Sequence, residues 1–219
     1  TWINQVNKIK KLPSLFLANE FFDALAIKQF IKKKNLWFEK FVKFENKERA
    51  FFIEKKTNIK KLEKKINLKI SKNQNFIEYS ELGLNYLNEI SKIIKKNTGG
   101  LLLIDYGYED KKMKNTLKGV SKHKFANIFD NIGNTDITHN INFDLFKKFT
   151  KQMGNLESIL TSQKKFLLRM GISERAEVIS KNLNFSEKAN IYYRLRRLID
   201  DHQMGNLFKV MLIKNKKNK

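Results

Sequence analysis

The sequence predicts an α/β fold organised around a parallel sheet, on the strength of two buried strands and one amphipathic helix. Ser14–Ala18 and Leu101–Ile104 are short apolar runs, the pattern of strands that are buried on both faces. Glu81–Lys96 carries apolar residues three or four positions apart, and Ser80 is suited to cap its first turn. The helix leads through Gly99 into the second strand, so the order of elements is that of an α/β unit.

Polar and acidic residues follow both strands at the point where each strand ends. Asn19 and Glu20 come directly after the first strand, with Asp23 one turn later, and Asp105 and Tyr106 follow the second. Ligands bind at the edge of an open sheet where its parallel strands end, so we expect Glu20, Asp23 and Asp105 to converge on one cleft. The alternative is that Glu20 and Asp23 only cap the N-terminus of a following helix.

Length and composition exclude several classes of protein. The chain has 219 residues and a mass of 26.0 kDa, the size of one domain with at most a small insertion. It has no cysteine, so disulfides and thiolate metal sites are excluded. No apolar run approaches the roughly 18 residues of a membrane span, and no secretory leader is recognised. His123, His139 and His202 lack metal-ligand spacing, and we expect no metal.

The formal net charge of +23 is compatible with a polyanionic partner. However, only six of the 45 basic residues are arginine, and lysine is spread along the chain together with abundant asparagine and isoleucine. An A/T-rich genome raises these three residue types together. Nucleic-acid sites concentrate charge and use arginine, and here only Arg194, Arg196 and Arg197 cluster. We therefore interpret the charge mainly as solvated surface, with a basic nucleic-acid-binding domain as an alternative.

Residues 31–75 differ in pattern and are predicted to be an insertion into the α/β domain, which comprises residues 1–30 and 76–213. A three-stranded β-meander is expected in Ile27–Ile31, Leu36–Phe44 and Arg49–Glu54, with turns at Lys33–Asn35 and Asn46-Lys47. A short helix and loop should follow in Thr57–Asn75. The aromatic residues of the meander can form a cross-strand core, which we favour, or a stacking platform for bases; they are Trp37, Phe38, Phe41 and Phe44.

The last third of the chain is predicted to alternate helices and strands. A helix from Asn142 to Gln152 is followed by a strand at Leu156–Leu160. The next helix is capped by Thr161 or Ser162 and ends at Gly171, and further helices are expected at Ser173–Lys181 and at Glu187–Asp200, the latter capped by Ser186. A strand at Leu207–Ile213 and a frayed tail at Lys214–Lys219 complete the chain.

Thr116–Phe143 is polar, long and nearly without periodicity, and it follows shortly after the end of a strand. Segments of this kind are more often functional than idle. His123 has the chemistry of a general base near neutral pH, although a histidine on a polar loop is also commonly structural. Asp136 and Thr138 are expected to support the segment, for example through an Asx-type turn.

Several stretches of the sequence together resemble one family. They are ANEFFDALAIKQF (Ala18–Phe30), GGLLLIDYGY (Gly99–Tyr108), TLKGVSKHKFANIFDNIGNTDITHNINF (Thr116–Phe143), SQKKFLLRMGI (Ser162–Ile172) and MGNLFKV (Met204–Val210). The resemblance is to the MidA-like proteins, class I S-adenosylmethionine-dependent methyltransferases whose mitochondrial members assist complex I assembly by methylating a protein arginine. It spans nearly the whole chain in the right order and implies a Rossmann-like sheet, with the β-meander inserted and helices at the C-terminus.

The resemblance also implies roles for the residues singled out above. Glu20 and Asp23 are the catalytic candidates, because a carboxylate can align a guanidinium and receive its proton. Asn19, together with Glu20, would face the S-adenosylmethionine cofactor. The substrate-binding candidates are Asp105, Tyr106, His123, Asp136 and Thr138. Neither a glycine-rich phosphate loop nor a serine–histidine–aspartate constellation is visible, so a hydrolase is not supported.

The sequence departs from the family pattern in four ways. Ala26 stands where proline is usual, and Asn140 and Asn142 stand where histidine or another polar residue and aspartate are common. The glycine-rich cofactor loop of the family lies upstream of the Asn19-Glu20 motif, and we expect that N-terminal half, with about three strands, to be absent from these residues.

The absence of that loop should weaken binding of the cofactor. Binding of S-adenosylmethionine with a micromolar dissociation constant corresponds to about 8 kcal/mol, and the loss of a charged contact costs roughly 1.5–3 kcal/mol. We therefore expect S-adenosylmethionine to bind residues 1–219 only at about millimolar concentration or weaker.

Three functional interpretations remain open on the sequence. The first is an S-adenosylmethionine-dependent methyltransferase whose substrate is a protein arginine, which the resemblance associates with a respiratory-complex subunit. The second is a non-catalytic scaffold, derived from the same family, that binds a protein partner; the third is the basic nucleic-acid-binding domain. A homodimer is compatible with the sequence, and the resemblance fits either a bacterial cytoplasm or a mitochondrial matrix.

Overall fold

The computed structural model describes residues 2–9, 12–45, 49–122 and 124–216. Three of the sequence expectations fall partly or wholly on other residues: the role of His123, the turn at Asn46-Lys47 and the end of the tail, residues 217–219. They lie outside the described residues.

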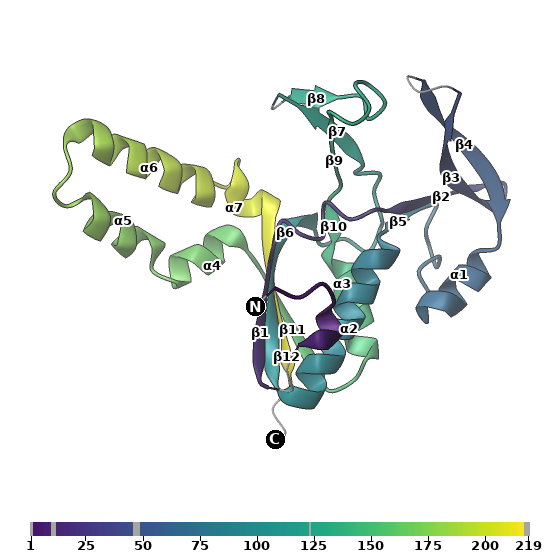
Figure 1. Cartoon of the computed structure of the whole chain (residues 1–219), viewed down its shortest axis with the longest axis horizontal. Helices are drawn as coiled ribbons and strands as arrows, with labels where there is room; N and C mark the ends of the chain where they lie inside the picture. The colour runs from purple at the N-terminus through teal and green to yellow at the C-terminus, as the bar shows by residue number, and fades with distance from the viewer. Residues whose placement is uncertain (1, 10–11, 46–48, 123, 217–219) are drawn as a thin grey trace.

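The main sheet combines parallel and antiparallel strands in the order β1-β6-β12-β11. β1 (Ser14–Asn19) runs parallel to β6 (Gly99–Tyr108), whereas β12 (Phe208–Asn215) runs antiparallel to both β6 and β11 (Leu156–Ser162). The short β10 (Ile141–Asn142) pairs with the last residues of β6. Figure 1 shows this sheet nearly edge-on at the centre of the molecule. The predicted α/β fold is confirmed. The prediction that the first strand is buried on both faces is wrong, because β1 lies at the edge of the sheet and every second residue of it is exposed, among them Leu15 and Leu17.

Two strands are longer than predicted because their polar ends still form ladder hydrogen bonds. β6 has 10 residues instead of the four aliphatic ones, and it includes both Asp105 and Tyr106. β12 continues through Asn215, which pairs with Leu156, so the first residues of the expected tail belong to the sheet. The register that matters for function places Asn19 opposite Ile104, next to Asp105.

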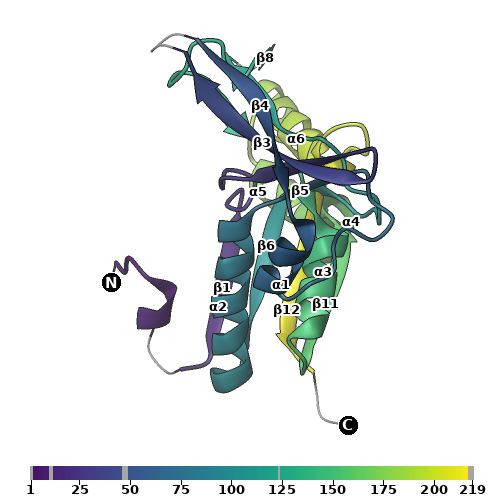
Figure 2. The ribbon, with the colours of Figure 1, turned by 90° about the vertical axis from the view of Figure 1, so that its right-hand side faces the viewer.

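Two helices cover one face of the sheet, as Figures 1 and 2 show. α2 (Glu81–Asn97) is the predicted helix, and the Ser80 hydroxyl accepts a hydrogen bond from the Gly83 amide at 2.9 Å, as expected of a cap. α3 (Phe143–Gln152) begins at the predicted cap, Asn142. The core between these helices and the sheet contains fully buried side chains, among them Leu87, Ile94, Leu101, Leu103 and Phe143.

The predicted meander is present, but its sheet has four strands. β2 (Lys28–Lys33), β3 (Leu36–Phe44), β4 (Ala50–Thr57) and β5 (Phe76–Tyr79) are ordered β4-β3-β2-β5, and α1 (Ile59–Ile66) lies in the connection to β5. Trp37 is buried in the core, whereas Phe41 and Phe44 are exposed. The aromatic residues therefore do not form one continuous core, and the domain boundaries at 31 and 75 stay a prediction.

The polar segment expected to be irregular contains a small antiparallel sheet. β7 (Lys118–Ser121) lies between β8 (Lys124–Ala126) and β9 (Asp136–Thr138). Each strand has only three or four residues, too few to give a clear alternation in the sequence. The sheet lies near the exposed strands of the meander, and the rings of Phe52 and Phe129 meet edge to face with 4.9 Å between centroids.

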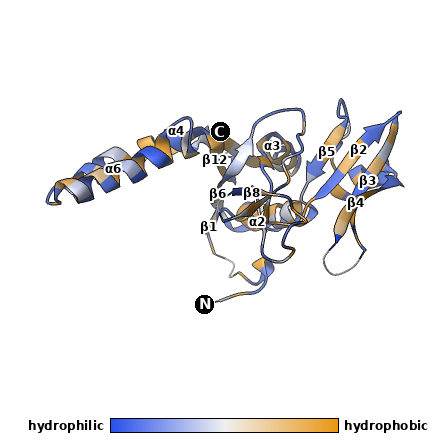
Figure 3. Cartoon of the chain, turned by 90° about the horizontal axis from the view of Figure 1, so that it is seen from above, coloured by the Kyte–Doolittle hydropathy of each residue, from blue (hydrophilic) through white to orange (hydrophobic). Residues whose placement is uncertain are grey.

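Four helices form an arm that extends from the main sheet on the side away from α2 (Figures 1 and 3). They are α4 (Gln163–Arg169), α5 (Ile172–Ser180), α6 (Phe185–Ile199) and α7 (Met204–Leu207). The prediction that Ser186 caps α6 is wrong. The cap is Asn184, whose side chain accepts from the Glu187 amide while the Glu187 carboxylate accepts from the Asn184 amide.

A single-turn 3-10 helix, η1 (Val6–Lys8), precedes β1. Every helix within the described ranges is too short or too polar to cross a lipid bilayer.

Candidate functional site

The loop after β1 is a tight turn anchored to the neighbouring strand. The Glu20 amide donates to the Ile104 carbonyl at 3.0 Å, which extends the β1–β6 ladder by one residue. Glu20 itself has a φ of +46°, a left-handed conformation that is uncommon for a residue other than glycine. Residues 20–27 form turns and bends rather than a helix, so the interpretation of Glu20 and Asp23 as helix caps is wrong. Glu20 is left exposed at the carboxyl end of the sheet.

Asp105 holds this loop in place from beneath. Its side chain is fully buried, and Oδ2 accepts hydrogen bonds from the amides of Phe22 at 3.0 Å and Asp23 at 3.3 Å. Oδ1 accepts from the Tyr106 amide at 2.9 Å. The pKa of Asp105 is raised to about 7, first by burial and then by the charge of Asp23, while the three amide hydrogen bonds oppose the increase. The two carboxylates are therefore close enough to influence one another.

Asp23 is also buried, with 7% of its surface exposed, and it is held from a second side by β9. The Thr138 hydroxyl donates to Asp23 Oδ2 at 2.9 Å, and the His139 amide donates to the Asp23 carbonyl at 3.2 Å. The other carboxylate oxygen, Oδ1, has no hydrogen-bond partner among the described residues. One acidic side chain thus has a fixed position and a free acceptor.

Tyr106 lies at the same edge of the sheet, and the nearby negative charges affect its pKa. Its pKa is raised by burial first, and then by the negative charges of Glu20, Asp23 and Asp105. Its ring packs against that of Phe208 with 4.0 Å between centroids, which fixes the side chain against β12.

The structure therefore brings together most of the residues that the sequence singled out. Asp23, Asp105 and Thr138 are joined through hydrogen bonds to one loop, and Glu20 and Tyr106 lie beside them. Asn19 is exposed at the end of β1. Asp136 is exposed two residues before Thr138 in β9, and alternation along a strand places both side chains on the same face. His123 lies outside the described residues.

A groove of about 680 Å³ adjoins this cluster between the meander and the β7–β9 sheet. Asp23 and Thr138 line it together with two buried residues that sequence reasoning did not select, Gln29 and His139. A signal was available for His139, because it directly follows Thr138 in the chain. The sequence contains no such signal for Gln29, since a polar residue within a meander strand usually faces solvent.

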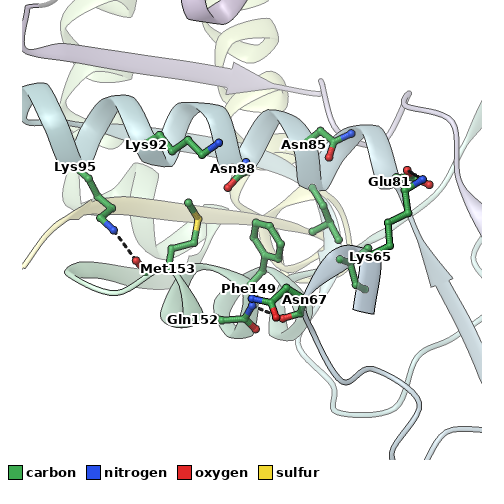
Figure 4. Close-up of a pocket in the computed structure, with 12 residues that line it drawn as sticks. Lys65, Asn67, Glu81, Asn85, Asn88, Lys92, Lys95, Phe149, Gln152 and Met153 are labelled. Carbon is green, nitrogen blue, oxygen red and sulfur yellow. Dashed lines mark hydrogen bonds and ion pairs between the residues drawn. The ribbon is translucent and has the colours of Figure 1, made fainter. Parts of the chain in front are cut away.

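A second cleft, of about 500 Å³, lies between α1, α2 and α3 (Figure 4). It is lined by lysines and amides, and the close-up shows that several of these groups are already paired. Lys95 Nζ donates to the Met153 carbonyl at 2.7 Å, Lys65 forms an ion pair with Glu81, and the Gln152 amide donates to the Asn67 carbonyl. Neither a catalytic nor a substrate-binding candidate lines this cleft.

Comparison with known proteins finds one family and several relatives. A family model described as "Putative S-adenosyl-L-methionine-dependent methyltransferase" matches residues 1–160. The mitochondrial protein arginine methyltransferase NDUFAF7 of Danio rerio is 26% identical over 223 residues, which cover 98% of this chain and 50% of the relative. The Homo sapiens protein of the same name is 25% identical over 214 residues, covering 95% of this chain and 47% of the relative. The chain thus spans about half the length of these curated relatives.

Solved structures share the fold over the whole chain. A Burkholderia thailandensis protein crystallised with bound S-adenosyl-homocysteine superposes with a TM-score of 0.78 at 19% identity, covering 100% of this chain and 57% of the other. A further crystal structure from the same organism gives a TM-score of 0.80 at 18% identity, covering 99% of this chain and 58% of the other. At such identities the likeness concerns the fold.

Proposed function

This chain belongs to the family of S-adenosyl-L-methionine-dependent methyltransferases whose model matches residues 1–160, and we propose that its parent protein methylates an arginine side chain of a protein. The names of the Danio rerio and Homo sapiens relatives support arginine as the acceptor. From the resemblance noted in the sequence we further propose that the substrate is a subunit of a respiratory complex. The relatives are named as mitochondrial, which supports the matrix for a eukaryotic parent; a bacterial parent would act in the cytoplasm.

The observation that carries this proposal is the fixed loop with two acids at the carboxyl end of β1. Transfer of a methyl group to nitrogen is an in-line displacement, so most of the acceleration comes from positioning the acceptor. The guanidinium has a pKa above 12 and must lose a proton as the new bond forms. Asp23 is fixed by Thr138 and retains one free oxygen, which suits it to align the guanidinium and receive that proton. Glu20, exposed beside it, would share this role.

The buried carboxylate of Asp105 supports a positioning role in place of direct contact with the substrate. Within the described part of the chain, its carboxylate accepts hydrogen bonds only from backbone amides of the Glu20–Asp23 loop and of Tyr106, and its side chain has no exposed surface. Tyr106 and Thr138 lie beside the loop, Asp136 is exposed in the same strand as Thr138, and all three remain the candidates for contact with the substrate peptide.

S-adenosyl-L-methionine supplies the methyl group when it is bound. The residues present fit one side of such a cofactor: Asn19 and Glu20 are polar, exposed and at the carboxyl end of β1. β1 is an edge strand whose Leu15 and Leu17 are 75% and 68% exposed, so among the described residues nothing encloses the cofactor from that side. We propose that the glycine-rich loop lies in a part of the parent outside residues 1–219, and that this chain alone binds the cofactor at millimolar concentration or weaker.

The test is to incubate the full-length parent with isotopically labelled S-adenosyl-L-methionine and candidate protein substrates, and to locate the label by mass spectrometry. We expect the label on arginine. Label on another residue type would contradict the arginine proposal, and no transfer to any protein would favour the non-catalytic scaffold. Calorimetry on residues 1–219 should detect no micromolar binding of the cofactor; if it does, the proposal of a missing loop is wrong.

A further inference from the structure

Buried polar atoms without partners are not scattered at random in this molecule. Across the described residues, five buried side-chain atoms have no hydrogen-bond partner. Three of them, Asp23 Oδ1, Gln29 Oε1 and His139 Nε2, belong to residues that line the groove beside the candidate site. Buried polar groups are nearly always paired in folded proteins, since a buried group without a partner has lost its hydrogen bonds to water and destabilises the fold. Their concentration in one groove indicates a site for a ligand.

The chemistry of the three atoms describes that ligand. The carboxylate oxygen of Asp23 and the amide oxygen of Gln29 accept hydrogen bonds only. The Gln29 amide group is already oriented, because its Nε2 donates to Glu78 Oε2 at 2.6 Å and to Asn115 Oδ1 at 2.9 Å. His139 is buried, and burial lowers its pKa against the opposing effects of Glu78, Asp23 and the backbone of Asn140 and Leu25, which favours the neutral imidazole. A neutral imidazole has one ring nitrogen that can accept a hydrogen bond. A ligand that complements these three acceptors is a cation with several N–H donors in one plane.

The walls of the groove indicate what accompanies this cation. They are largely apolar and include Phe41, Phe52, Phe129, Ile132 and Ile137. Two cations also line the groove, but each is engaged. Lys28 forms ion pairs with Glu39 and Glu81, both at 3.5 Å, and Lys40 Nζ lies 4.0 Å above the centre of the Phe52 ring. The walls therefore suit the aliphatic stem of a long side chain and apolar neighbours on either side of it.

We propose that Asp23, Gln29 and His139 form an acceptor set that binds the guanidinium of the substrate arginine, with apolar residues of the same peptide against the aromatic wall. The proposal rests on the proposed function and deepens it. A guanidinium offers five N–H donors in a fixed plane and can satisfy all three acceptors, whereas an ammonium is a single point charge. Gln29 and His139 are positioning residues for the substrate, and Asp23 connects them to the chemistry.

The test uses residues 1–219 without cofactor and a blocked peptide in which apolar residues flank one arginine. NMR titration compares it with the same peptide carrying citrulline, which keeps the shape and loses the charge, or lysine. We expect the arginine peptide to bind at least about tenfold more tightly than either analogue. No discrimination by the unchanged chain would overturn the proposal.

Two variants of one residue locate the binding site. His139→Asn keeps a nitrogen near the position of Nδ1 and removes Nε2, and we expect it to weaken binding of the arginine peptide about tenfold. His139→Gln returns a polar atom near the position of Nε2 and should recover most of the affinity. His202→Asn, at an exposed histidine, is the matched control and should bind as the unchanged chain does. Equal affinities for both His139 variants and the control would contradict the acceptor set.

This outcome is independent of the test for methyl transfer. If the parent methylates arginine while residues 1–219 fail to discriminate arginine from citrulline, the acceptor set is wrong and the proposed function stands. If discrimination depends on His139 and the parent transfers no methyl group, the guanidinium site stands and the enzymatic proposal fails.

Discussion

Replacing Asp105 with alanine should lower the free energy of unfolding by about 3 kcal/mol or more. The substitution removes the acceptor of three backbone amides, those of Phe22, Asp23 and Tyr106, two of which are buried with Asp105 itself. Each orphaned donor costs about 1–3 kcal/mol. Relief of the repulsion between Asp105 and Asp23 offsets part of this loss. For a chain of this size we expect the melting temperature to fall by roughly 6–12 °C.

The matched control is Asp201→Ala. Asp201 is an exposed aspartate whose carboxylate pairs with Lys164 at 2.6 Å, and such surface pairs contribute at most about 1 kcal/mol. Thermal and urea unfolding of the two variants side by side give the comparison. If Asp105→Ala and Asp201→Ala unfold at the same temperature, Asp105 does not anchor the loop.

Replacing Asp23 with asparagine should reduce methyl transfer by the full-length parent by at least about 100-fold. Asparagine can still accept the hydrogen bond from Thr138, so the loop keeps its anchor. The substitution removes the negative charge that we propose orients the guanidinium and receives its proton. Positioned proton acceptors typically contribute 10²- to 10⁴-fold. The measurement is the initial rate of labelled methyl incorporation, with Asp201→Asn as a control for the loss of one surface charge.

The companion variant Glu20→Gln separates the two acids. We expect it to reduce the rate less than Asp23→Asn, because Glu20 is exposed and its charge is screened by water. A rate for Asp23→Asn within threefold of the unchanged enzyme would remove Asp23 from the chemistry, whatever the effect at Glu20.

The part of this site that the sequence could predict is the part encoded by neighbouring residues. An apolar run followed by acids identifies the end of a strand, and two such strands that pair in parallel place Glu20, Asp23 and Asp105 at one edge of the sheet. The caps at Ser80 and Asn142 were predictable for the same reason, since a cap acts within three residues of itself. Asn184 was missed although its capping box with Glu187 is equally local.

The rest depends on contacts between distant segments. Whether Asp105 faces solvent or is buried is decided by the amides of Phe22 and Asp23, more than 80 positions away in the chain. Gln29 and His139 line the same groove only because β2 and the end of β9, which His139 follows, come together there. β5 was missed because four residues between a loop and a helix, three of them buried, have neither the alternation nor the length that identifies a strand.

The central claim is that acids from two separate strands share one site, and the pKa of Asp105 tests it most directly. It can be followed through the carboxyl carbon by NMR titration, in the unchanged chain and in Asp23→Asn. The structure predicts a pKa of about 7 in the unchanged chain, well above the ordinary value of about 3.9, and a lower pKa once the charge of Asp23 is removed. An ordinary pKa for Asp105, or a raised one that does not respond to Asp23→Asn, would contradict the claim.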